Sequence, residues 1–189
     1  MNKNICVYCS SSNNLEEKYY QFANELGKRI AQEGYNLVYG GTTVGMMGSV
    51  AKAVLEQGSK VIGVTPQKIF DFLEHFEKAE VIITEDMRSR KAKMEELSDV
   101  FLALPGGFGT FEEIFEIIVA KQLAYHKKAI IFLNFDGFYN PLLTMFDSIY
   151  KNGFAKENMK NIYFVANTID DVFQYLATYT EKDVANKWS

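Results

Sequence analysis

The 189-residue sequence is poor in residues that cross-link or interrupt a chain, with two cysteines, three prolines and one tryptophan. Cys6 and Cys9 have the C-x-x-C spacing of redox pairs, but they stand in an apolar run, 5–9, that predicts a strand. Alternation along a strand places the two thiols on opposite faces, so we interpret both as core residues. A sequence with no disulfide framework favours a reducing, cytoplasmic location.

An excess of basic charge is also missing. The net charge is −4 and the isoelectric point is near 5.3. Proteins that bind DNA or RNA usually have a basic surface, so we expect no nucleic acid polymer as a partner. No segment approaches the ~18 apolar residues that suggest a membrane span. The N-terminal residues lack the apolar core of a signal peptide, so we expect neither a membrane partner nor secretion.

Apolar residues make up 48% of the sequence, which is enough to build a full core. Their pattern predicts strands that alternate with helices, and this alternation is typical of a parallel sheet. We expect a single α/β domain at 1–180, Rossmann-like and doubly wound, with a mainly parallel sheet, helices on both faces and a polar tail at 181–189. The strands are predicted at 4–9, 36–39, 60–64, 81–84, 100–104, 129–133 and 162–165. The helices are predicted at 15–32, 44–57, 88–97, 111–123, 140–151 and 168–180.

Two of the predicted strand-to-helix junctions are rich in glycine, at 39–48 and at 104–113. Ligands of doubly wound sheets bind at such junctions, beyond the carboxyl ends of the strands. Glycine lets the backbone approach a ligand closely, and a helix N-terminus offers free N–H groups to an anion. Thr110 adds a hydroxyl donor. Neither junction has a Walker A or G-x-G-x-x-G pattern. The junctions therefore predict a cradle for one phosphate, with an ordinary structural turn as the alternative.

Three acidic residues follow the second junction: Glu112, Glu113 and Glu116. Acids in the first turn of a helix stabilise it through the helix dipole, which is one explanation for them. Beside a phosphate site, however, a carboxylate repels the ligand. Breaking an N-glycosidic bond requires a group that stabilises positive charge on the sugar or activates water, and a carboxylate can do either. From their spacing we expect Glu113 and Glu116 to share a helix face, with Glu112 directed elsewhere.

A short basic cluster at 87–91 contains Arg88, Arg90 and Lys91 at a predicted helix start. Such a cluster is usually a solvated face. Cations in a first turn oppose the helix dipole, which favours a functional role instead. The two histidines, His75 and His126, have no metal-ligand spacing, and we expect both on the surface and no metal site. We find no pattern of a nucleophile triad.

Together the two motifs resemble those of the LOG family, the cytokinin riboside 5′-monophosphate phosphoribohydrolases, whose members were once labelled possible lysine decarboxylases. The resemblance runs from about residue 7 to 176. The signature P-G-G-x-G-T-x-x-E is matched in full at 105–113, and M-x-x-R-K is matched by Met87, Arg90 and Lys91. Further agreement lies at Cys9-Ser10-Ser11, Gly40-Gly41, Asp136-Gly137 and Gly153-Phe154.

The resemblance implies a Rossmann-like fold, a homodimer and Arg90 and Glu113 as the catalytic pair. It implies hydrolysis of a purine nucleoside 5′-monophosphate, either AMP or a cytokinin-type nucleotide, to free base and ribose 5-phosphate without a cofactor. The substrate- or phosphate-binding positions that we expect are Ser10, Gly41, Lys91, Gly106, Gly107, Phe108, Gly109 and Thr110. Thr42, Val119 and Ala120 depart from the family pattern, in ways that bear on the choice of base.

Two other functions are compatible with the sequence. Molybdenum-cofactor carriers share a similar glycine-rich fingerprint, so a non-enzymatic carrier or sensor of a phosphorylated ligand is the alternative. A carrier would not need the pairing of Arg90 with Glu113. The decarboxylase label would require a lysine that forms a Schiff base with pyridoxal phosphate, and the sequence singles out none.

Overall fold

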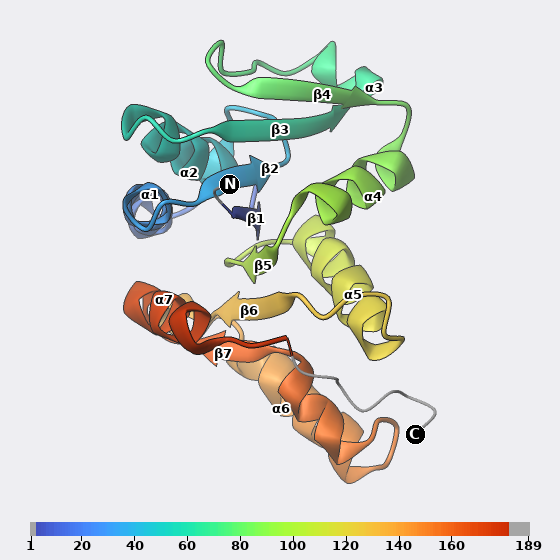
Figure 1. Ribbon diagram of the computed structural model, residues 1–189. Coiled ribbons are helices and arrows are strands. Elements are labelled where there is room, and N and C mark those ends of the chain that lie inside the picture. Colours follow the sequence, from blue (N-terminus) through green and yellow to red (C-terminus); the bar gives the residue numbers. More distant parts are fainter. Residues whose placement is uncertain (1–2, 182–189) are drawn as a thin grey trace.

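The computed structural model describes residues 3–181, and its seven strands form one sheet in the order β4-β3-β2-β1-β5-β6-β7 (Figure 1). Every pairing between neighbouring strands is parallel. This confirms the predicted Rossmann-like α/β fold, with a sheet that is parallel throughout. The strands are β1 (Asn4–Tyr8), β2 (Asn36–Tyr39), β3 (Val61–Pro66), β4 (Glu80–Thr84), β5 (Val100–Ala103), β6 (Ala129–Leu133) and β7 (Phe164–Ala166).

Helices cover both faces of the sheet, with α1, α2 and α7 on one side and α4, α5 and α6 on the other (Figure 1). Within residues 3–181 none of them is both long enough and apolar enough to cross a membrane. Their bounds are α1 (Glu17–Gln32), α2 (Gly45–Glu56), α3 (Gln67–Phe70), α4 (Met87–Leu97), α5 (Phe108–Gln122), α6 (Asn140–Lys151) and α7 (Ile169–Thr178), with 3-10 helices η1 (Phe135–Gly137) and η2 (Glu157–Ile162).

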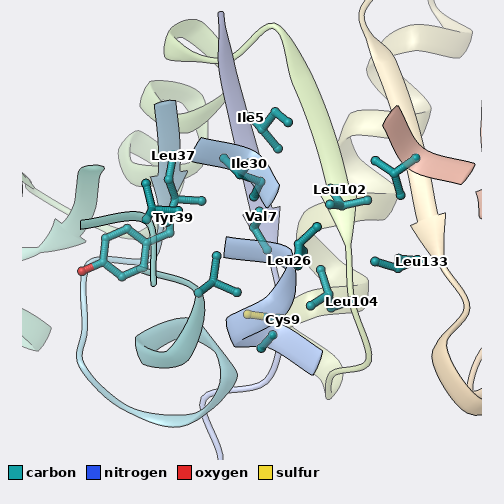
Figure 2. Packing of buried hydrophobic residues seen from close by; sticks show 14 of the residues in the cluster. Ile5, Val7, Cys9, Leu26, Ile30, Leu37, Tyr39, Leu102, Leu104 and Leu133 are labelled. Carbon is teal, nitrogen blue, oxygen red and sulfur yellow. The ribbon is translucent and has the colours of Figure 1, made fainter. Parts of the chain in front are cut away.

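The sheet separates two apolar clusters, which is why its central strands are apolar at nearly every position. Figure 2 shows the first cluster, where Ile5 and Val7 of β1 meet Leu26 of α1. As predicted, alternation sends Cys9 to this cluster and Cys6 to the other. Both thiols are buried and free, and burial raises the pKa of Cys6 to about 12. Neither is a reactive thiolate at neutral pH.

The strand order reverses beside β1. The chain moves outward from β1 to β4 and then returns to add β5 on the opposite side of β1. Strands β1 and β5 stay in register to their carboxyl ends. There the N–H of Leu104 donates to the carbonyl of Tyr8, and the N–H of Ser10 donates to the carbonyl of Pro105. The segments that follow β1 and β5, which begin at Cys9 and Leu104, therefore leave the sheet side by side. This is the position at which doubly wound proteins bind ligands.

Most predicted elements match the observed ones within a few residues, and two differences lie near the carboxyl edge of the sheet. Helix α5 begins at Phe108, three residues before the predicted start, because Gly107 is already the extended N-cap residue. The short helix α3 lies between two predicted strands, in a stretch where we predicted no helix. Except for Glu181, the predicted tail 181–189 lies outside the described residues.

The prediction that both histidines lie on the surface is wrong for His126, which is 9% exposed. Its Nδ1 accepts the N–H of Lys128 at 3.2 Å, so Nε2 carries the proton and donates to the carbonyl of Ile117 at 3.0 Å. Burial lowers the pKa of His126 to about 4. His75 is half-buried, with its ring stacked on Phe70 at a centroid distance of 4.4 Å.

The buried His126 predicts a pH-dependent stability. The unfolded chain binds a proton at this residue near pH 6.5, whereas the folded chain does so only near pH 4. The free energy of unfolding should therefore fall as the pH falls from 6.5 towards 4, by at most about 1.4 kcal/mol per pH unit from this group. His126→Gln, whose amide N–H can still reach Ile117, should show a flatter slope in urea unfolding across that range. Identical slopes in the two proteins would contradict the prediction.

Candidate active site

A cleft of about 470 Å³ opens at the carboxyl edge of the sheet, beside the reversal point. The loops after β1, β2 and β5 form its floor, and α3, α4 and α5 contribute its walls. It brings together Arg90 and Glu113 with five of the predicted binding residues. These are Ser10, Gly107, Phe108, Gly109 and Thr110.

The N-terminus of α5 forms one end of this cleft. No side chain caps the helix, so the N–H groups of its first turn are left for a ligand. The turn is tight, because a Cβ atom at Gly106 would stand 2.1 Å from Oγ1 of Thr110. Phe108, in contrast, is 93% exposed at the mouth of the cleft. The geometry is that of an anion site lined by backbone donors.

Arg90 is buried, with 6% of its surface exposed. Its Nε donates to the carbonyl of Val64 at 2.9 Å, and its Nη1 donates to Oε1 of Glu113 at 2.5 Å. On the other side the guanidinium lies against Gly40, where a Cβ atom would be 2.7 Å from Nη2. Contacts to β3, to the loop after β2 and to α5 therefore fix this side chain in one place.

A capping box explains how a basic cluster can begin α4. Asp86 is the N-cap residue, and it accepts a hydrogen bond from the N–H of Ser89 at 2.8 Å. Its carboxylate offsets the cationic side chains of the first turn. The predicted solvated face applies to Arg88, which is exposed, and not to Arg90.

Glu113 leaves the first turns of α5 towards the cleft, and its side chain is 11% exposed. Burial raises the pKa of this carboxyl above its usual range, and the charge and hydrogen bond of Arg90 oppose the rise without cancelling it. A carboxylate in such a position can exchange a proton closer to neutral pH than an exposed glutamate can. This is the property that general acid–base chemistry requires.

The predicted pairing of Glu113 with Glu116 on one helix face is wrong. Nζ of Lys91 contacts Oε1 of Glu112 and Oε2 of Glu116, so these two acids share the outer face of α5. Glu113 alone turns towards Arg90. The error arose because an i,i+4 pair fits a common partner as well as an i,i+3 pair does. Lys91 is not among the residues that line the cleft.

Two predicted glycines also lie outside this lining. Gly106 borders a neighbouring cleft of about 310 Å³. Gly41 has φ +86° and packs against Thr65, and its carbonyl oxygen contacts the ring of His75. A glycine is needed there because that backbone conformation is strained for other residues.

Other lining residues escaped the sequence interpretation. Three of them are apolar, Met47, Ile69 and Leu73, and they line the cleft together with Met87 of the matched motif. The spacing of Ile69 and Leu73 is helical, but four residues of helix are too few to give a periodic signal. Thr42 also lines the cleft and is 3% exposed. Val119, in contrast, is half exposed on α5 and does not line it.

Comparisons with known proteins give a consistent result. The sequence model of the family described as possible lysine decarboxylase matches residues 47–176. Cytokinin riboside 5′-monophosphate phosphoribohydrolase LOG5 from Arabidopsis thaliana is 42% identical over 178 residues, which cover 94% of this chain and 78% of that protein. Cytokinin riboside 5′-monophosphate phosphoribohydrolase LOG from Oryza sativa subsp. japonica is 40% identical over 188 residues, covering 98% and 78%.

Solved structures with the same fold include molybdenum-cofactor proteins. The molybdenum cofactor binding protein from the phototrophic bacterium Rippkaea orientalis has a TM-score of 0.72 at 22% identity, covering 94% of this chain and 97% of that one. The Moco carrier protein from Chlamydomonas reinhardtii has a TM-score of 0.70 at 26% identity, covering 95% and 100%.

The buried ion pair predicts that Arg90→Met destabilises the protein in a pH-dependent way. Removing one partner of a buried pair costs about 3–5 kcal/mol, because the other charge is left unpaired. In the variant the pKa of Glu113 in the folded protein rises further above the value in the unfolded chain. At low pH the carboxyl is neutral and can stay buried. As the pH rises, burying the ionised carboxylate becomes costly, and the folded protein loses stability. Urea unfolding should show a larger loss at pH 8 than at pH 5. A loss of equal size at both values would refute this account.

Proposed function

The chain belongs to the LOG family, that of the cytokinin riboside 5′-monophosphate phosphoribohydrolases, and from this premise we propose that it hydrolyses the N-glycosidic bond of a purine nucleoside 5′-monophosphate. The products are the free base and ribose 5-phosphate. The observation that supports the proposal best is the pair of Arg90 and Glu113 in one cleft with the open N-terminus of α5.

In this proposal the phosphate binds first to the backbone N–H groups at 108–110. These donors are fixed by the helix, so they cost little reorganisation when the anion arrives. The hydroxyls of Thr110 and Ser10, both in the lining, are further donors to the phosphate oxygens. Binding at this end places the ribose near Glu113, one helical turn further along α5.

Bond cleavage then depends on Glu113. As the bond between C1′ and the base nitrogen breaks, positive charge develops on the ribose, and the carboxylate stabilises it. A water molecule adds its oxygen to C1′ and gives a proton to Glu113. The electron pair of the broken bond stays on the base nitrogen, which takes up a proton from solvent or from the carboxyl of Glu113. Arg90 holds the carboxylate in place, because its own Nε is anchored to the carbonyl of Val64. Its positive charge favours the ionised form of Glu113. Its other N–H groups remain available to the substrate.

The base is the less defined part of the substrate. The apolar side chains of Met47, Ile69, Leu73 and Met87 suit a flat purine ring, with or without an apolar substituent on N6. The decisive experiment is incubation with AMP and with isopentenyladenosine monophosphate, followed by chromatography for free base and ribose 5-phosphate. The matching nucleosides without phosphate are the controls and should not react. Absence of free base from both nucleotides would overturn the proposal.

We further propose that the protein acts as a homodimer in the cytoplasm. Two aromatic side chains near the cleft are largely exposed, Phe72 at 80% and Phe108 at 93%, and they offer apolar surface that a second subunit could cover. The buried, unpaired thiols of Cys6 and Cys9 suit a reducing compartment. Analytical ultracentrifugation tests the dimer directly.

A non-enzymatic carrier is the second candidate, favoured by the similarity to the Moco carrier protein. Tight retention of a phosphorylated ligand without turnover would support it. The decarboxylase label has weaker support. Among the described lysines, Lys121 has a pKa lowered to about 8 by burial, but its Nζ donates to the carbonyl of Lys128 and to Tyr179, outside the cleft lining.

Glu113→Gln should separate binding from chemistry. The amide keeps the size of the side chain but cannot accept a proton or balance the charge on the sugar. We expect kcat to fall by about 10²–10⁴-fold while the dissociation constant of the nucleotide stays close to that of the wild type. Glu25→Gln, on the exposed side of α1, is the matched control and should leave both values unchanged. A fully active Glu113→Gln protein would remove Glu113 from this role.

The pH profile of kcat/KM should carry the same signature. Because burial raises the pKa of Glu113, activity should be lost on acidification at a pH above the usual range of glutamate. The ionised carboxylate is the active form, so the rate falls as the pH falls through this raised pKa. The acidic limb should be missing from the residual activity of Glu113→Gln. A limb that persists there would belong to another group.

A further inference from the structure

We propose that Lys91 is a positioning residue for Glu113 and does not bind the substrate phosphate. The inference rests on the proposed function, since it assigns a role within the same site. It departs from the role that the family resemblance implies for this position. Three observations carry it: where the ammonium group is held, what the neighbouring residue on α4 does, and which charges surround Glu113.

The ammonium group of Lys91 already has two partners. Its Nζ contacts one carboxylate oxygen of Glu112 and one of Glu116, and 13% of its side chain is exposed. A lysine has three donors, so two of them are occupied by charged acceptors. Glu116 lies eight residues beyond the start of α5, about 12 Å along the helix at 1.5 Å per residue. The ammonium is therefore directed along the outer face of α5, away from the N–H groups at its start.

Lys91 and its neighbour Arg90 together hold α4 against α5. Arg90 reaches Glu113 inside the cleft, and Lys91 reaches Glu112 and Glu116 outside it. Arg90 and Lys91 are adjacent on α4, and their partners lie within five consecutive residues of α5. Rotation or sliding of α5 relative to α4 would break at least one of these ion pairs. A displacement of about 1 Å at a reacting group can cost 10²-fold in rate. The ion pairs of Lys91 therefore protect the geometry of Glu113.

The same contacts balance the charge around Glu113. Glu112 raises the pKa of Glu113 and Lys91 lowers it. Without Lys91, the carboxylates of Glu112 and Glu116 would repel each other and Glu113 across one to four residues of helix. Glu113 would then hold its proton at a higher pH, and less of it would be ionised at neutral pH.

The experiment compares Lys91→Met with Lys91→Arg and with Lys93→Met. Lys93 is the matched control, since it lies on the same helix and pairs with Glu96 at 3.0 Å on the surface. For Lys91→Met we expect kcat to fall about tenfold or more, and the acidic limb of the pH profile to move to higher pH. Lys91→Arg should restore most of the rate, because a guanidinium can bridge the same two acids. Lys93→Met should behave as the wild type does.

Binding of ribose 5-phosphate, measured by calorimetry, tests the phosphate role without any turnover. We expect its dissociation constant in Lys91→Met to stay within about threefold of the wild-type value. The variant Lys91→Met/Glu112→Gln/Glu116→Gln removes the unbalanced acids as well. In this protein the acidic limb should return towards the wild-type position while ribose 5-phosphate still binds.

The opposite pattern would overturn the inference. A lysine that binds phosphate would give a large loss of ribose 5-phosphate affinity in both Lys91→Met proteins, with an unchanged pH limb. If the folded wild-type protein released no base from any nucleotide, the proposed function would fail by itself. The effect of Lys91 on Glu113 would then be measured as the carboxyl pKa by NMR in wild type and Lys91→Met. An identical pKa in the two proteins, each folded by circular dichroism, would sink the positioning role.

Discussion

The guanidinium of Arg90 joins the two halves of this molecule by hydrogen bonds to each of them. It rests on a carbonyl of β3, which belongs to the first half of the sheet, and on a carboxylate of α5, which belongs to the second. A charge with so little exposure is stable only when its donors are satisfied, so its surroundings are constrained in turn. Gly40 must lack a side chain, Val64 must leave its carbonyl free, and Glu113 must face inward.

The topology of the sheet makes the contact between Arg90 and Glu113 possible. In a sheet whose order reverses beside β1, the loops after β1 and β5 diverge to opposite faces and leave a crevice between them. Helix α4 brings Arg90 to the crevice immediately before β5 enters the sheet, and α5 brings Glu113 immediately after it. The ion pair therefore spans the strand that completes the central part of the fold. The glycine-rich turn lies between the two, at the start of α5.

Sequence patterns predicted the fold better than they predicted the local geometry of individual side chains. Unbroken apolar runs identify buried parallel strands, and the motif at 105–113 identifies the turn, because both signals are local. The environment of His126 depends on a carbonyl nine residues away and on burial by β5, which no local pattern encodes. The direction of Glu113 relative to Glu116 failed for a similar reason. Which acid faces the cleft is decided by where α4 lies, and that is a tertiary fact.

The position of β1 has a consequence for the order in which the protein can assemble. One edge of β1 pairs with β2, which lies about thirty residues later in the sequence. Its other edge pairs with β5, where Ile5 lies opposite Val100. Closing so long a loop is slow, and on a ribosome it must await the synthesis of more than half the chain. Arg90 and Glu113 flank β5, so their contact forms only after that closure. The nascent first half can bury much of its core, but the two side chains of the cleft cannot meet until β5 has paired with β1.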